Sequence, residues 1–115
     1  KQAIQQWGNL GAFVSALYTE DYDLLSRAMV DKVIEPARAM LIPEFESIRS
    51  SALQAGALGS GISGSGPSIY ALSKSKAQAE KVGQAMRKAT ENLALEVDLY
   101  ISPINPKGIT ILETK

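Results

Sequence analysis

The sequence concentrates its glycines in one short stretch. Of the nine glycines, five lie between residues 56 and 66, at Gly56, Gly59, Gly61, Gly64 and Gly66. Because glycine has no Cβ, such a stretch can adopt positive φ angles and leaves backbone N–H groups uncovered. Apolar runs flank it on both sides, so the pattern predicts two strands, over 57–62 and 68–73, joined by the turn S-G-S-G-P at 63–67.

From the residues alone, this turn has three interpretations. Successive N–H groups in a tight turn can bind an anion such as phosphate, and the hydroxyls of Ser63 and Ser65 add donors. A plain hairpin turn and a flexible linker are the alternatives, and the apolar flanks argue against the linker. Residues 59–64 match the dinucleotide pattern G-x-G-x-x-G, but Pro67 and a predicted strand follow where that motif requires a helix. The anion loop and the plain hairpin both remain open.

Helical spacing dominates the segment before the glycines. Apolar residues at 4, 7, 10, 14 and 17 predict a first helix whose stripe, including Trp7, faces the core. Gly8 and Gly11 on this helix indicate close approach of a neighbouring backbone. Asp21 or Asp23 is expected to cap a second helix that runs to about residue 30.

The helix before the glycine stretch is expected to have Pro43 in its first turn and to end at Gly56. After the glycine stretch, Ser75 and Gln78 form a capping-box pattern that predicts a long helix. Alternating apolar residues then predict strands over 97–102 and 109–112. The order of elements indicates one α+β domain, residues 1–115, with helices packed on a four-stranded antiparallel sheet.

Composition excludes several classes of protein. The chain has 115 residues, 45% of them hydrophobic, and a formal net charge of +0, so no general electrostatic field attracts nucleic acid or an anionic membrane. It contains no cysteine and no histidine, which removes disulfides, thiolate chemistry and the Ser-His-Asp triad. No apolar run approaches the ~20 residues of a membrane helix. The first residues lack a methionine and begin inside a helical pattern, which suggests a fragment of a longer protein.

Residues 61–68, G-I-S-G-S-G-P-S, resemble the third conserved motif of the GHMP kinases, a superfamily of small-molecule kinases. Two further segments carry the resemblance: E-P-A-R at 35–38 followed by L-I-P at 41–43, and Gly56-Ala57 before the motif. The S-G-S-G-P form is the one typical of the homoserine kinase family. The resemblance implies a ferredoxin-like C-terminal domain. The superfamily's amino-terminal domain, which carries the ATP phosphate loop and the acidic magnesium ligand, has no counterpart in this sequence.

The resemblance also implies roles for individual residues. Arg38 and Asn9 are expected to bind the substrate, with Arg38 on its carboxylate. Residues of the third motif would support the ATP phosphate loop: Gly61, Ser63, Gly64, Ser65 and Gly66. No residue of this chain is expected to be a catalytic base or a metal ligand. Glu35 is expected either to orient Arg38 or to cap a helix start.

For the full-length enzyme, the resemblance implies ATP and Mg²⁺, L-homoserine as the acceptor, and O-phospho-L-homoserine as the product, in threonine biosynthesis. It also implies contact with the enzyme's own amino-terminal domain and a cytoplasmic location, and it leaves a homodimer open. Two alternatives stand beside it: another GHMP kinase, whose substrate need not carry a carboxylate, and a non-catalytic α+β module that binds a small effector.

Overall fold

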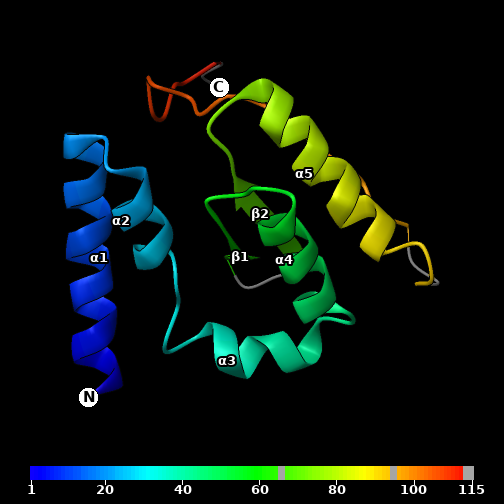
Figure 1. Cartoon of the computed structure of the whole chain (residues 1–115), viewed down its shortest axis with the longest axis horizontal. Helices are drawn as coiled ribbons and strands as arrows, with labels where there is room; N and C mark the ends of the chain where they lie inside the picture. The colour runs from blue at the N-terminus through cyan, green and yellow to red at the C-terminus, as the bar shows by residue number, and fades with distance from the viewer. Residues whose placement is uncertain (65–66, 94–95, 113–115) are drawn as a thin grey trace.

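The computed structural model describes residues 1–64, 67–93 and 96–112. Its elements, in chain order, are α1 (Gln2–Thr19), α2 (Tyr22–Ala28), α3 (Glu35–Arg38), the 3₁₀ turn η1 (Ala39–Leu41), α4 (Phe45–Gln54), β1 (Gly59–Ser63), β2 (Ser68–Leu72) and α5 (Lys76–Ala89). Figure 1 shows α1 and α2 as an antiparallel pair at one side and α4 and α5 at the other, with α3 leading from one pair to the other. The chain therefore has the predicted α+β character.

Strands β1 and β2 form the predicted antiparallel hairpin, in the register Gly61↔Tyr70 and Ile62↔Ile69. Successive side chains of a strand point to opposite faces of the sheet. Leu72 packs with the α1–α2 core, whereas its neighbour Ala71 packs with the α4–α5 core. The hairpin thus carries one hydrophobic core on each face and joins the two helix pairs.

Helix α1 forms as predicted, but its apolar stripe does not face the core. Trp7 is 69% exposed, and Ala16, at 2% exposure, is the buried residue of this helix. The prediction that Trp7 lies in the core is therefore wrong. A Cβ added at Gly8 or Gly11 would meet no atom of the described chain within 4 Å, so the expected close backbone approach is also absent there. Helix α2 packs on the face of α1 that contains Phe13 and Ala16, and the residues of the apolar stripe stay more than 40% exposed in the described chain.

The predicted helix ends agree with the structure more closely. The Asp21 carboxylate accepts a hydrogen bond from Leu24 N–H at 3.0 Å, and the Ser75 hydroxyl accepts one from Gln78 N–H at 3.2 Å. Helix α4 ends in a Schellman arrangement, in which Ala57 N–H donates to the Ala52 carbonyl at 3.0 Å. Pro43 is the exception, since α4 begins at Phe45, beyond the turn that contains the proline.

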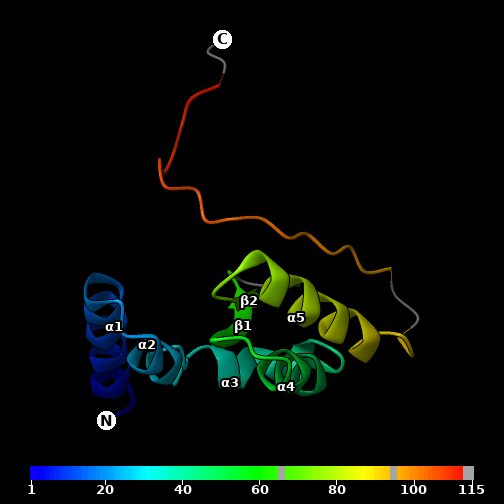
Figure 2. The same ribbon diagram turned by 45° about the horizontal axis from the view of Figure 1, so that its top comes forward.

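The described sheet has two strands and not the predicted four. Residues 97–102 and 109–112 are described, but they belong to no strand. Figure 2 shows the chain after α5 running back over that helix and then turning away from it toward the C-terminus. Leu99 and Ile101 lie against Gly83 of that helix, where an added Cβ would be 3.1 Å and 3.3 Å from their methyl groups. The alternation over 97–102 thus identified residues that pack, but they pack on α5 and not on the edge of a strand. The apolar residues of 109–112 are exposed.

In the described part of the chain, no helix combines the length and the apolar character that crossing a membrane requires.

Candidate functional site

The glycine-rich turn lies at the end of the β1–β2 hairpin, where the chain is exposed. Gly64 has φ of +65°, a left-handed conformation that glycine adopts without steric penalty. A Cβ at this position would meet nothing within 4 Å in the described chain, so the turn is open on that side. Ser63 and Gly64 are exposed, and the predicted site residues Ser65 and Gly66 lie outside the described residues. The described half of the turn therefore leaves its backbone accessible.

Just before the turn, Gly61 lies under a carboxylate. An ideal Cβ on Gly61 would be 2.6 Å from Glu35 Oε2 and 3.3 Å from the Tyr70 ring and hydroxyl. The backbone N–H of Ile62 donates a hydrogen bond to the same Glu35 carboxylate. A side chain at position 61 would displace the carboxylate, so the absence of one is what allows the hydrogen bond. Glycine is therefore needed at position 61 because the carboxylate packs closely against it, and not because the turn must be flexible.

Glu35 also forms an ion pair inside the molecule. Its Oε1 lies 3.6 Å from Arg49 Nε of α4, and the two side chains are only 17% and 24% exposed. Glu46, which is largely exposed, lies 4.0 Å from the same guanidinium. Burial raises the pKa of Glu35 above its ordinary value, while the Ile62 N–H and Arg49 partly offset that rise. Burial therefore disfavours the ionised form of Glu35, and the Ile62 N–H and Arg49 reduce this effect.

Asp31 organises the start of α3. Its carboxylate accepts hydrogen bonds from Val33 and Ile34 N–H at 2.9 Å each and from Glu35 N–H at 3.0 Å. Burial raises the pKa of Asp31, but the three N–H donors outweigh that effect and hold the pKa below its ordinary value of 3.8. Asp31 thus caps the short helix, and Glu35 is left to reach the hairpin. The expectation that Glu35 caps the helix or orients Arg38 did not include this contact with the hairpin.

A cavity of about 280 Å³ lies between α1, the segment before α3, and the hairpin. Its polar lining residues are Gln6, Asn9, Asp31, Glu35 and Tyr70. Asn9 Nδ2 donates to the Val30 carbonyl at 3.0 Å, which fastens α1 to the wall of this cavity. The structure therefore places Asn9, Glu35 and Ile62 of β1 around one cavity.

Arg38 is the last residue of α3 and is exposed. It takes part in an interaction with another group, and it is not a lining residue of the cavity that contains Asn9. Arg38 and Asn9, the two residues expected to bind substrate, therefore do not line one cavity in the described chain.

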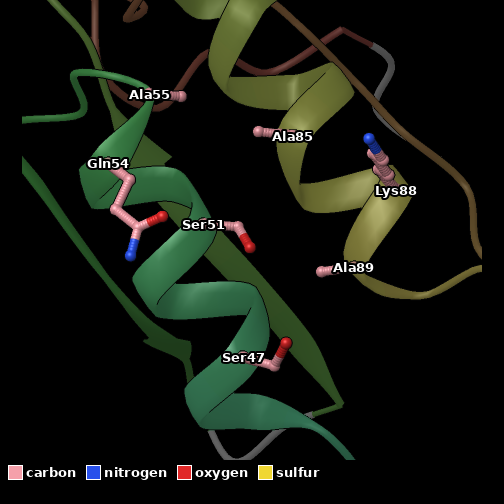
Figure 3. A pocket seen from close by; sticks show the side chains of 7 residues that line it. All are labelled: Ser47, Ser51, Gln54, Ala55, Ala85, Lys88 and Ala89. Atoms are coloured by element: carbon pink, nitrogen blue, oxygen red, sulfur yellow. The ribbon is translucent and has the colours of Figure 1, made fainter.

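A second cavity, of about 410 Å³, lies between α4 and α5. Figure 3 shows Ser47 and Ser51 of α4 pointing toward Ala85 and Ala89 of α5, with Lys88 at the rim. None of the residues expected from the sequence to bind a ligand lines it. The Glu35 region, where the glycine-rich strand meets α3, is therefore the better candidate site.

Sequence reasoning missed three parts of this site: the cap by Asp31, the Ile62 N–H bond to Glu35, and the ion pair with Arg49. A glycine inside a predicted strand is a recognised sign of close approach by another group. Gly61 lies in a predicted strand, so a close contact could be expected there, but nothing in the sequence indicated that the contacting group is Glu35. Among residues 1–64, 67–93 and 96–112, no group of three or more acidic side chains is placed to hold a metal ion.

The family model for the C-terminal domain of GHMP kinases matches residues 13–92. These residues contain α2 to α5, the glycine-rich hairpin and most of the Glu35 site. The chain therefore belongs to the GHMP kinase family, through its C-terminal domain.

Curated relatives named homoserine kinase align along nearly the whole chain. The protein of Chlorobaculum tepidum is 52% identical over 114 residues, and that of Xylella fastidiosa strain M12 is 33% identical over 109 residues. These alignments cover 97% and 95% of this chain but only 35% and 34% of the relatives. The chain thus spans about a third of the length of the curated relatives it matches.

A solved structure agrees with this relationship. The crystal structure of homoserine kinase from Cytophaga hutchinsonii matches with a TM-score of 0.87 and 50% sequence identity. The match covers 90% of this chain and 33% of that chain.

The cap by Asp31 generates a first prediction. Asp31→Ala should lower the free energy of unfolding by about 1–2 kcal/mol at neutral pH, because three backbone N–H groups lose their acceptor. Since the folded pKa of Asp31 is depressed, its contribution is present above the unfolded value of about 3.8 and is lost as pH falls through the folded pKa. Urea unfolding at several pH values measures the effect.

Asp23→Ala is the matched control for this experiment, because it removes an exposed carboxylate whose partner is Arg27. Its effect on the unfolding free energy should be much smaller at every pH. Equal losses for the two variants would contradict the capping role of Asp31.

The packing of Gly61 generates a second prediction. Gly61→Ala should lower the free energy of unfolding by about 1–3 kcal/mol, because the new methyl group overlaps the Glu35 carboxylate. In a double-mutant cycle with Glu35→Ala, the two losses should be less than additive.

Gly8→Ala serves as the control for Gly61→Ala, since its Cβ meets open space on a helix and should stabilise the chain by about 0.5–1 kcal/mol. Additive losses in the cycle would show that Gly61 and Glu35 are not in steric contact.

Proposed function

We propose that this chain forms the C-terminal, substrate-side part of a homoserine kinase. The enzyme would transfer the terminal phosphoryl group of ATP to the hydroxyl of L-homoserine and form O-phospho-L-homoserine in threonine biosynthesis. The observation that carries the proposal is the open glycine-rich hairpin turn, next to a largely buried carboxylate that packs on β1, in a chain about half identical to proteins of that name. A reaction between water-soluble metabolites favours the cytoplasm.

The turn would act on the phosphates through its backbone. Phosphoryl transfer depends mainly on positioning and on neutralising charge, so N–H donors held in place suffice. Gly61, Ser63 and Gly64 would present this backbone, together with Ser65 and Gly66. ATP and Mg²⁺, which neutralises phosphate charge, would be held mainly by the amino-terminal part of the enzyme.

Arg38 would bind the carboxylate of homoserine, because a planar guanidinium can pair with a carboxylate through two hydrogen bonds. Its exposed place at the end of α3, beside the segment that reaches the hairpin, supports this role. Asn9 would offer its amide oxygen to the substrate, while its amide nitrogen stays bonded to Val30.

The exposed stripe of α1 would be covered by the amino-terminal part of the same enzyme. The 18 residues of this helix include no charged side chain, and Trp7, Leu10 and Leu17 are all more than half exposed. A contiguous apolar face of this kind marks an interaction surface. In the alternative arrangement, a second copy covers the stripe and the enzyme is a homodimer.

The complete enzyme would also have the ferredoxin-like sheet of four antiparallel strands. Residues 97–102 and 109–111 retain the alternation of a half-buried strand, and Ile109 and Ile111 are 99% and 82% exposed in this chain. Pairing of these segments with the hairpin would bury those side chains.

The role of Arg38 generates a third prediction. In the full-length enzyme, Arg38→Ala should raise the homoserine KM at least tens-fold and the ATP KM much less, since losing a charge-assisted pair costs roughly 2–5 kcal/mol. Arg38→Lys should recover only part of the loss, because an ammonium group cannot reproduce the two-point geometry. Steady-state kinetics with each substrate varied in turn provides the measurement.

A homoserine analogue with a neutral group in place of the carboxylate is the control. The wild-type enzyme should discriminate strongly against the analogue, and Arg38→Ala should discriminate much less. An unchanged homoserine KM in folded Arg38→Ala would remove Arg38 from the substrate site and favour a GHMP kinase with another substrate.

A fourth prediction concerns the 115 residues by themselves. The chain should fold but release no ADP from ATP in the presence of homoserine, because the main ligands of ATP would lie outside it. A coupled ADP-release assay on the chain and on the full-length enzyme makes the comparison. Turnover by the chain well above background would contradict the proposal that the main ligands of ATP lie outside it. A full-length protein that is inactive on homoserine would contradict the proposed substrate.

A further inference from the structure

The Glu35 carboxylate connects three elements that a phosphoryl-transfer site must hold in register. Glu35 is the first residue of α3, the helix that ends at Arg38. Its carboxylate accepts the Ile62 N–H of β1, one residue before Ser63 and the turn. The same carboxylate forms the ion pair with Arg49 of α4. One side chain thus joins the helix of the proposed substrate residue to the strand that leads into the glycine-rich turn.

The contact allows little freedom of position. Glu35 Oε2 occupies the space in which a Cβ of Gly61 would stand, and the Tyr70 hydroxyl borders the same space. Arg49 Nε is buried and makes no hydrogen bond within the described residues, and Glu35, at 3.6 Å, is its nearer counter-charge. Removing the Glu35 charge would leave Arg49 with only the largely exposed Glu46 as a counter-charge, and it would weaken the acceptor for Ile62 N–H.

We propose that Glu35 is a positioning residue, which fixes the end of β1 that leads into the glycine-rich turn relative to Arg38, through the Ile62 N–H bond and the ion pair with Arg49. The inference rests on the proposed function, because it assumes that the glycine-rich turn faces the phosphate that is transferred. Glu35 itself would touch neither substrate. Its effect would appear in the rate of the transfer step, whereas Arg38 would affect substrate binding.

The charged and titratable groups around Glu35 favour this role for its ionised form. Arg49 attracts the carboxylate, whereas Asp31 before α3 and Glu46 of α4 oppose its charge. Tyr70 of β2 has a pKa raised by burial and by the nearby Glu35 and Asp31 charges, so it stays a neutral phenol at physiological pH. Burial raises the pKa of Glu35, and the protonated form would be a weaker acceptor for Ile62 N–H.

Kinetics of the full-length enzyme provides the first test. Glu35→Gln should lower kcat by about ten- to a hundredfold, as expected when reacting groups are misplaced by up to an ångström, and should change the homoserine KM much less. Glu46→Gln is the matched control: it removes the same charge from the side of Arg49, but Glu46 is 72% exposed and would not hold the turn. Its kcat should equal that of the wild type. Wild-type kcat in folded Glu35→Gln would overturn the proposal.

Nuclear magnetic resonance of the 115-residue chain provides a second test that needs no activity. As pH falls, the Ile62 amide proton should shift with the same midpoint as the Glu35 side-chain carboxyl, and this midpoint should lie above 4.5. The shift should persist in Glu46→Gln. An Ile62 amide that does not follow the Glu35 titration would overturn the proposed link, even if Glu35→Gln fails to fold.

The two tests separate this inference from the proposed function. If the full-length wild type is inactive on homoserine, the proposed function fails, while the titration of Ile62 still decides whether Glu35 holds the strand. If the wild type is active, but the Ile62 amide does not follow the Glu35 titration and Glu35→Gln leaves kcat unchanged, only the positioning role fails.

Discussion

A glycine in a β-strand leaves its backbone open to the close approach of another group. Gly61 is such a residue, and Glu35 uses the space to accept the next N–H of the strand. The contact places the first residue of α3 on β1, while Arg49 of α4 balances the charge. Asp31 satisfies the N–H groups at the start of α3, so the Glu35 side chain is free to reach the hairpin. This one largely buried carboxylate thus links α3, α4 and the end of β1 at the candidate site.

The rest of the molecule holds the hairpin between two cores but leaves other apolar surface uncovered. Leu72 and Ala71 anchor β2 to helix pairs on its two faces. By contrast, Trp7 and the stripe around it on α1, together with Ile109 and Leu112 near the end of the chain, are exposed. Burying such side chains is worth roughly 1.5–3 kcal/mol each. The chain spans about a third of the length of its relatives, and the exposure of these side chains supports the proposal that another part of the enzyme covers α1.

Local patterns in the sequence predicted the local structure well. The glycine turn with apolar flanks predicted the hairpin, and Asp21 and Ser75 predicted helix starts, because a cap depends on residues three positions apart. The GHMP resemblance was confirmed by the family match over residues 13–92. The site roles of Arg38, Asn9 and the turn residues stay predictions.

Predictions that depended on distant partners were less successful. Periodicity showed that α1 has an apolar face, but not that α2 would pack on the face of Phe13 and Ala16 and leave Trp7 exposed. Alternation over 97–102 identified a packing face, yet Leu99 and Ile101 lie on Gly83 of α5 and not on a strand edge. The pairing of Glu35 with Ile62 and Arg49 joins residues up to 27 positions apart, and no local spacing encodes it.

The most direct test of the account is a crystal structure of the full-length enzyme with L-homoserine and a non-hydrolysable ATP analogue. The account predicts that the Arg38 guanidinium contacts the homoserine carboxylate, that the backbone of the glycine-rich turn faces the terminal phosphate, and that Glu35 remains on Ile62 N–H. A complex in which the terminal phosphate lies away from the turn and homoserine lies away from α3 would contradict it.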